Sequence, residues 1–191
     1  MVKSLTAPRI GIAGYGFVGR SLSQLQHMYD VEVYDPFVEG FDHNLSAFEA
    51  DIVFACVPTP PAANGELDTS IVELVSSRWK ELRSDNSILV IKSTIPIGTI
   101  DRLSKELETE NIVHNPEFLT ERTAMHDFMN PDEVIVGGKP AAANIVLDMY
   151  KRFYDKDTIQ YCAVPARDAE MIKMTRNSFY ALKVSFFNEV Y

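Results

Sequence analysis

Short apolar runs rich in valine and isoleucine alternate along this chain with apolar segments long enough to form helices. The short runs are residues 9–13, 31–34, 52–56, 88–91, 111–113 and 134–136. These runs are continuous rather than alternating in polarity, which is typical of strands covered on both faces. The helix-length segments are residues 18–28, 70–82, 99–107, 141–153 and 166–191. Strand alternating with helix predicts βαβ units, a parallel sheet and an α/β fold.

The composition excludes several classes of protein. The chain has 191 residues, of which 46% are apolar, so it suits a folded domain and argues against disorder. No apolar run reaches the ~18 residues of a membrane span. The first ten residues, MVKSLTAPRI, contain no signal-peptide core, so we expect a cytoplasmic protein. The net charge of −9 would repel a phosphate backbone, which argues against a nucleic-acid partner.

The two cysteines and four histidines do not have the number or spacing of a disulfide framework or a metal site. We therefore expect no bound metal. Cys56 and Cys162 are expected to be small buried residues rather than reactive thiols.

A glycine-rich motif, GYGFVG, follows the first predicted strand and begins the first predicted helix. In such a motif Gly14 permits a tight turn, Gly16 lets the backbone approach a pyrophosphate, and Gly19 lets the helix pack closely on the strand. The helix N-terminus adds free N–H groups for the phosphates. The motif predicts a Rossmann-type parallel sheet that binds a dinucleotide, with helices on both faces and a long C-terminal helix. The alternative is a glycine-rich turn without a ligand.

Asp35 ends the second predicted strand, about 20 residues beyond the first glycine, where an acidic residue hydrogen-bonds the adenosine ribose. A carboxylate there would repel a 2′-phosphate, and Pro36 and Phe37 supply no cation to hold one. We therefore expect NAD rather than NADP. The alternative is a turn-forming Asp-Pro pair.

Two further segments follow predicted strands, at the edge of the sheet where open α/β folds bind ligands. Residues 57–67 are rich in proline, and residues 114–132 are polar. In the second segment Glu117 and Glu121 would share a face if the segment were helical. Such acids suit general acid–base catalysis, although carboxylates are also common at helix starts.

Lys173 and Asn177 lie four residues apart and share a face of the last predicted helix. A lysine and a carboxamide together can hold a substrate oxygen as negative charge develops on it. The alternative is a solvated lysine beside an exposed asparagine. Thr94, which follows the strand at 88–91, is either a ligand contact or part of a local turn.

Several motifs together are similar to those of one family. They are GIAGYGFVG, VYD, FACVPTP, KSTIPIGT, NPEFLTERTAMHDFMNPDEVIVGG and AEMIKMTRNSFYALKVSFFNEV. On these motifs the chain resembles the nucleotide-sugar 6-dehydrogenases, the UDP-glucose/GDP-mannose dehydrogenase family. This family oxidises a sugar 6-hydroxyl group to a carboxylate in two NAD-dependent steps, through an aldehyde and a cysteine thioester. The resemblance implies an oxidoreductase of polysaccharide biosynthesis that acts on a UDP- or GDP-sugar.

The resemblance also implies roles for individual residues. The implied NAD contacts are Gly14, Gly16, Phe17, Val18, Gly19, Asp35, Val57, Pro58, Thr59, Thr94 and Glu121, of which the last three lie near the nicotinamide. Glu117 resembles the carboxylate assigned to thioester hydrolysis. Lys173 resembles the lysine that stabilises the oxyanion, with Asn177 beside it.

One departure concerns the nucleophile. In the family a catalytic cysteine lies downstream in a glycine-rich motif, and neither Cys56 nor Cys162 falls in such a motif. Without a thiolate no thioester forms, so we do not expect the complete reaction from this chain alone. The remaining hypotheses are NAD binding with one alcohol oxidation of the β-hydroxyacid dehydrogenase type, a non-catalytic NAD-binding module, and a remnant that binds nothing.

The last helix carries predictions about domains and assembly. We predict an NAD-binding domain over residues 1–165 and the start of a central helix over residues 166–191, with the C-terminal nucleotide-sugar domain absent. In the family this helix forms the dimer core. It would expose Phe186, Phe187 and Val190, and exposed apolar surface of this kind is usually buried by association. We therefore expect a homodimer.

Overall fold

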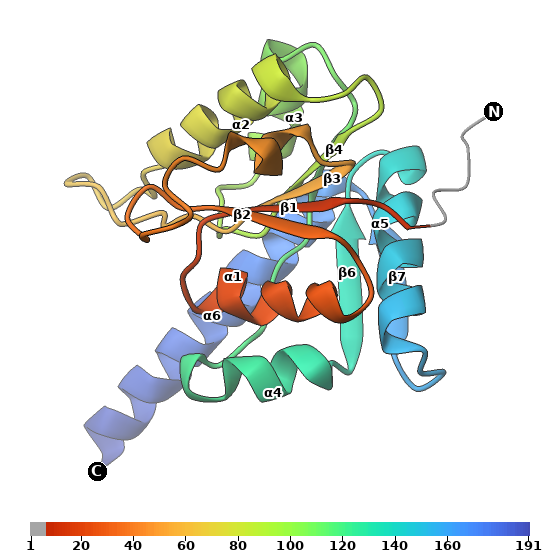
Figure 1. Ribbon diagram of the computed structural model, residues 1–191. Helices are drawn as coiled ribbons and strands as arrows, with labels where there is room; N and C mark the ends of the chain where they lie inside the picture. The colour runs from red at the N-terminus through yellow and green to blue at the C-terminus, as the bar shows by residue number, and fades with distance from the viewer. Residues whose placement is uncertain (1–6) are drawn as a thin grey trace.

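A mixed seven-stranded sheet forms the centre of the protein (Figure 1). The computed structural model describes residues 7–191, and the expectation about a signal peptide falls mainly on residues outside that range. The strands are β1 (Ile10–Ala13), β2 (Val31–Tyr34), β3 (Ile52–Ala55), β4 (Ile88–Ile91), β5 (Ile112–His114), β6 (Glu133–Gly137) and β7 (Gln160–Val164). Their order across the sheet is β2-β1-β3-β4-β5-β6-β7. The predicted Rossmann-type α/β fold is confirmed, and β7 is an additional strand that the analysis above did not predict.

The helices follow the predicted segments closely except at the first, and α4 is an additional short helix in the polar segment 114–132. They are α1 (Phe17–Leu22), α2 (Ser70–Leu82), α3 (Thr99–Glu106), α4 (Ala124–Met129), α5 (Pro140–Tyr154) and α6 (Ala166–Val190). Three 3-10 helices are η1 (Ser23–His27), η2 (Leu45–Glu49) and η3 (Glu121–Thr123). The single helix predicted over residues 18–28 is wrong, because α1 passes into η1. The hydroxyl groups of Ser21 and Ser23 donate to the carbonyl oxygens of Phe17 and Arg20, a pattern that distorts helices.

The sheet reverses direction once. Strands β1 to β5 are parallel and so are β6 and β7, but β5 and β6 pair antiparallel through His114 and Gly137. The prediction of a wholly parallel sheet is therefore wrong at this point. A parallel pair needs a crossover connection, whereas the chain between β5 and β6 contains only η3 and the short α4, which packs against α1.

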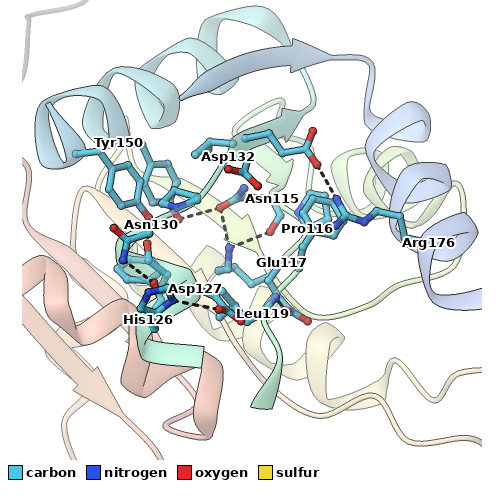
Figure 2. Close-up of a pocket in the computed structure, with 17 residues that line it drawn as sticks. Asn115, Pro116, Glu117, Leu119, His126, Asp127, Asn130, Asp132, Tyr150 and Arg176 are labelled. Carbon is cyan, nitrogen blue, oxygen red and sulfur yellow. Dashed lines mark hydrogen bonds and ion pairs between the residues drawn. The ribbon is translucent and has the colours of Figure 1, made fainter. Parts of the chain in front are cut away.

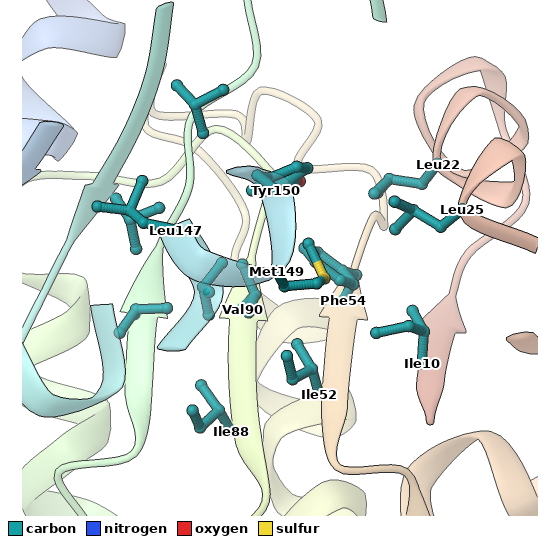
Figure 3. Close-up of a cluster of buried hydrophobic side chains, with 14 of the residues drawn as sticks. Ile10, Leu22, Leu25, Ile52, Phe54, Ile88, Val90, Leu147, Met149 and Tyr150 are labelled. Atoms are coloured by element: carbon teal, nitrogen blue, oxygen red, sulfur yellow. The ribbon is translucent and has the colours of Figure 1, made fainter. Parts of the chain in front are cut away.

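Both faces of the sheet are covered by helices. On one face Ile10 and Phe54 pack with Leu22 of α1 and Tyr150 of α5 (Figure 3). On the other face Val53 and its neighbours pack against α2 and α3 in a cluster that includes the buried Trp79. Burial on both faces explains why the strands are apolar at successive positions.

Helix α6 begins against the sheet and ends away from it. Ala169, Glu170 and Lys173 are buried near β5, β6 and α3, whereas every residue from Asn177 to Tyr191 is exposed. In Figure 1 the second half of the helix projects away from the other elements. The predicted long C-terminal helix is confirmed. Within residues 7–191 no helix has the length and apolar character needed to cross a membrane.

Candidate functional site

The carboxyl end of β1 leads into the glycine turn. Gly14 has a φ of +98°, and a Cβ atom there would lie 2.5 Å from the carbonyl oxygen of Cys56, so the turn requires glycine. A Cβ atom on Gly16 would meet nothing within 4 Å, which leaves open space beside the start of α1. A Cβ atom on Gly19 would overlap the carbonyl oxygen of Gly14, so the missing side chain lets helix and strand approach closely. The turn therefore combines close packing with one open cradle.

Asp35 is held beside this turn by two backbone donors. The N–H of Tyr15 donates to its Oδ2 atom at 2.7 Å, and the N–H of Phe37 donates to its Oδ1 atom at 2.9 Å. The contact with Phe37 forms the local Asp-Pro turn that was the alternative interpretation of Asp35. Each carboxylate oxygen keeps a further lone pair, so the same side chain can also accept hydrogen bonds from a ligand.

A cavity of about 430 Å³, the glycine-turn cavity, follows the carboxyl ends of β1 to β4. Its lining residues are Gly14, Tyr15, Gly16, Phe17, Val18, Asp35, Cys56, Val57, Pro58, Thr59, Lys92, Ser93, Thr94 and Glu117. Because β2 and β4 lie on opposite sides of β1 and β3, Asp35 and Lys92 mark the two ends of the cavity. All the predicted NAD contacts line it except Gly19, which acts in packing, and Glu121.

Glu121 is exposed at the start of η3 and does not line the glycine-turn cavity. The segment between it and Glu117 is irregular, so the two acids do not share a helical face and that prediction is wrong. No local pattern distinguishes the two cases, because the Asn-Pro pair before Glu117 suits a turn as well as a helix start.

Hydrogen bonds join the loops that follow β3 and β4. The hydroxyl group of Ser93 accepts a hydrogen bond from the N–H of Val57 at 3.1 Å and donates one to the carbonyl oxygen of Val57 at 2.6 Å. The hydroxyl group of Thr59 donates to the carbonyl oxygen of Thr94 at 2.9 Å. These bonds fix the wall of the cavity on which Thr59 and Thr94 lie.

Lys173 of α6 forms a buried ion pair with Glu117. Its Nζ atom lies 2.8 Å from Oε1 of Glu117, and the two side chains are 7% and 13% exposed. The alternative of a solvated Lys173 is therefore wrong. Asn177, one turn further along α6, is exposed and does not line the glycine-turn cavity.

A second cavity of about 250 Å³, the Asn115 cavity, is drawn in Figure 2. Lys92 and Glu117 line both cavities. The ammonium group of Lys92 donates to the carbonyl oxygen and to Oδ1 of Asn115 at 3.2 and 2.9 Å. The hydroxyl group of Tyr150 donates to the same Oδ1 atom at 2.9 Å, and Nδ2 of Asn115 donates to the carbonyl oxygen of Ile135 at 2.7 Å. Burial lowers the pKa of Lys92 to about 8, although Cys56 and Glu117 act in the opposite direction.

Arg176 closes the side of the Asn115 cavity. Its guanidinium group lies 3.7 Å from the centroid of the Phe118 ring, and its Nη1 atom lies 2.6 Å from Oε1 of Glu133. Stacking on a ring and pairing with a carboxylate suit the flat guanidinium group. This arrangement attaches α6 to β6 beside the Glu117–Lys173 pair.

Neither cysteine is placed for covalent chemistry. Burial raises the pKa of the Cys56 thiol to about 12, so it is protonated at neutral pH and a poor nucleophile. Cys162 is partly buried in β7 and does not line the glycine-turn cavity. Across residues 7–191 no group of three or more His, Cys, Asp or Glu side chains could hold a metal ion.

Lys92, Asn115 and Arg176 were not predicted as site residues from the sequence. One signal was available, because Lys92 directly follows a strand that is buried throughout, and a lysine at a buried position needs a partner. Asn115 and its partner Tyr150 are 35 residues apart, so no local pattern joins them.

Residues 23–155, well over half of the chain, match the NAD binding domain of the UDP-glucose/GDP-mannose dehydrogenase family. The chain belongs to this family. A UDP-glucose 6-dehydrogenase from Campylobacter jejuni is 31% identical over 145 residues, which are 75% of this chain and 36% of that protein. The cofactor of this dehydrogenase domain is NAD. The open space at Gly16 and the free lone pairs of Asp35 fit the diphosphate and the ribose of this dinucleotide.

Two solved structures of dehydrogenases share the fold. A UDP-glucose dehydrogenase from Pyrobaculum islandicum superposes with a TM-score of 0.82 at 26% identity, over 100% of this chain and 54% of that one. A GDP-mannose dehydrogenase from Pseudomonas aeruginosa superposes with a TM-score of 0.80 at 25% identity, over 95% of this chain and 52% of that one. The chain thus spans about half the length of these two dehydrogenases, and about a third of the Campylobacter relative.

Proposed function

We propose that this chain is the NAD-binding part of a nucleotide-sugar dehydrogenase and that NAD lies in the glycine-turn cavity. The observation that supports this best is that one cavity connects the glycine turn and Asp35 with Glu117. Lys173 does not line this cavity, but it is ion-paired with Glu117. Gly16 leaves room for the diphosphate, and the backbone N–H groups at the start of α1 bind its oxygens. Asp35 accepts hydrogen bonds from the hydroxyl groups of the adenosine ribose.

The other end of the cavity is proposed as the reacting end. NAD supplies a hydride acceptor there when it is bound. Thr59 and Thr94, which are hydrogen-bonded to each other, position the nicotinamide half of the cofactor. The ammonium group of Lys173 stabilises negative charge on the substrate oxygen. Glu117 is close enough to Lys173 to exchange a proton with that ammonium group. Asn177 adds a carboxamide one turn further along α6.

The proposed substrate is a UDP- or GDP-sugar, because relatives of this chain carry the names UDP-glucose 6-dehydrogenase and GDP-mannose dehydrogenase. A partly buried, protonated Cys56 does not support a thioester, so the residues of this chain support one oxidation of an alcohol at most. The second candidate is a module that binds NAD without turnover. The exposed position of Asn177 favours this candidate, since half of the substrate site would be open to solvent.

Calorimetry with NAD, followed by NADH absorbance in mixtures with UDP-glucose or GDP-mannose, tests the proposal. Binding together with NADH formation supports the single oxidation, and binding without NADH formation supports the module. Absence of NAD binding contradicts both. We also propose that residues 1–165 act as the NAD-binding domain and that the helix over residues 166–191 forms a homodimer.

A further inference from the structure

Three charged side chains are buried together where the glycine-turn cavity meets the Asn115 cavity. Lys92 and Lys173 are each 6% exposed, and the side chain of Glu117 is 13% exposed. The charge of Glu117 raises the pKa of Lys92, and the charge of Lys173 lowers it. Two ammonium groups and one carboxylate give this cluster a net charge of +1 when all are ionised.

The Asn115 cavity is also lined by Asp127, Asp132 and the ion pair of Glu133 with Arg176. Three titratable groups packed directly against the cluster do not cancel its charge. Cys56 reaches it from the end of β3, His114 from β5 and Tyr150 from α5. Burial raises the pKa of Cys56 to about 12 and that of Tyr150 well above its usual value, and burial lowers the pKa of His114 to about 3. All three groups are therefore neutral near pH 7.

The ammonium group of Lys92 is also fixed in place. Two of its three N–H groups donate to Asn115, which is itself held by Tyr150 and by the carbonyl oxygen of Ile135. The side chain lines the glycine-turn cavity at the end opposite Asp35. A cation held in this way stays close to whatever occupies that end of the cavity.

We propose that Lys92 determines which oxidation state of the cofactor this chain prefers, so that NADH binds more tightly than NAD⁺. The inference rests on the proposed function, in which the nicotinamide half lies at this end of the cavity. The nicotinamide ring carries a positive charge in NAD⁺ and none in NADH, and the rest of the dinucleotide is the same. A buried cluster with a net positive charge therefore repels the oxidised ring only. The same repulsion favours the reduced cofactor on the protein and so favours removal of a hydride from an alcohol.

The test compares dissociation constants for NAD⁺ and NADH, measured by calorimetry near pH 7. In Lys92→Met the ratio of the NAD⁺ constant to the NADH constant should fall roughly tenfold, which corresponds to about 1.4 kcal/mol. The matched control is Lys139→Met, which removes an exposed ammonium group paired with Glu110 and should leave the ratio unchanged.

A change of the ratio distinguishes a charge effect from a general defect, because a disturbed cavity weakens the binding of both forms of the cofactor. If Lys92→Met does not fold, the unmodified chain provides a second measurement. Because the pKa of Lys92 is about 8, raising the pH from about 7 to about 9.5 removes its charge, and the ratio should fall. Equal binding of NAD⁺ and NADH, or a ratio that neither Lys92→Met nor pH changes, overturns the inference. Absence of binding for both forms would instead contradict the proposed function.

Discussion

Lys173 on α6 and Glu117 in the loop after β5 are 56 residues apart, yet their side chains form a buried ion pair of 2.8 Å. The pair joins the last helix to the edge of the sheet at which the glycine-turn cavity opens. Because both groups are buried, the loss of either one leaves an uncompensated charge in a poorly solvated position. Lys92 lies close enough to Glu117 to offset part of that charge.

Lys173→Met is expected to lower the free energy of unfolding by about 2–4 kcal/mol, somewhat less than a buried pair without a second cation nearby. Urea denaturation followed by circular dichroism measures the change. Asn177→Ala is the matched control, because Asn177 lies on the same side of α6 but is exposed, and it should cost less than about 0.5 kcal/mol. An equal loss in both variants would show that the ion pair is not the source of the stability.

Gly16→Ala should separate cofactor binding from folding. Gly16 has a φ of −70°, and a Cβ atom there meets no neighbour, so the free energy of unfolding should change by less than about 0.5 kcal/mol. The new methyl group would occupy the space proposed for the diphosphate, so NAD affinity should fall by roughly tenfold or more. Thermal shift with and without NAD measures both quantities. Unchanged NAD affinity would place the diphosphate elsewhere.

Gly14→Ala should instead destabilise the fold, by about 2–4 kcal/mol, because it combines a positive φ with a contact of 2.5 Å to the carbonyl oxygen of Cys56. Gly40→Ala is the matched control. Gly40 has a similar φ of +87° but open space around it, so it should cost about 1 kcal/mol from backbone strain alone. Similar losses at the two positions would exclude the close contact as the cause.

Asp35→Asn should weaken NAD binding by roughly tenfold to a hundredfold, because hydrogen bonds to a charged acceptor contribute about 1.5–3 kcal/mol. It should also reduce the preference for NAD over NADP, since the carboxylate that repels a 2′-phosphate is gone. Calorimetry with both dinucleotides measures the two effects. Asp42→Asn, at an exposed acid near the same turn, should change neither affinity. If Asp35→Asn left both affinities intact, the role of Asp35 would be limited to stabilising the local turn with Phe37.

The parts of the site that could be predicted from the sequence are those built from local patterns. The glycine turn, Asp35 and the loop after β3 each depend on residues that directly follow a strand, so strand positions were enough to place them on one edge of the sheet. The continuous apolar runs likewise predicted burial on both faces.

The remaining features depend on contacts between distant residues. Lys92 is held by Asn115, 23 residues away, and Lys173 by Glu117, 56 residues away, and neither spacing has a local signature. The antiparallel pairing of β5 and β6 depends on where the irregular connection after β5 packs. The periodicity of apolar residues does not predict that packing. Glu121 matched its family motif, yet an irregular segment places it away from the cavity.

His114 is predicted to make the fold sensitive to acid. It is wholly buried at the end of β5, and within the described part of the chain neither ring nitrogen has a hydrogen-bond partner. Burial, with a smaller effect of Lys92, lowers its pKa from 6.5 to about 3. Between these two values the unfolded chain binds the proton more strongly than the folded chain. The free energy of unfolding should therefore fall as the pH drops from about 6.5 towards 3, by up to about 1.4 kcal/mol per pH unit from this group.

Urea denaturation at a series of pH values tests this prediction. His114→Leu should reduce the slope in that interval, and His43→Leu should not, because the side chain of His43 is 96% exposed. The same slope in His114→Leu and in the unmodified chain would assign the acid sensitivity to other groups.

The exposed half of α6 predicts association of the chain with a second copy. Phe179, Leu182 and Phe186 are 60%, 68% and 59% exposed, and apolar surface of this extent is usually covered in solution. Light scattering at micromolar concentration should report twice the chain mass of 21.5 kDa. Leu182→Glu should return the chain to a single copy without loss of helix content, because the substituted side chain is exposed in the isolated chain. Leu74→Glu is the matched control, since Leu74 is a similarly exposed leucine on α2, and it should leave the dimer intact. A mass of 21.5 kDa for the unmodified chain would contradict the proposed dimer while leaving the cofactor site unaffected.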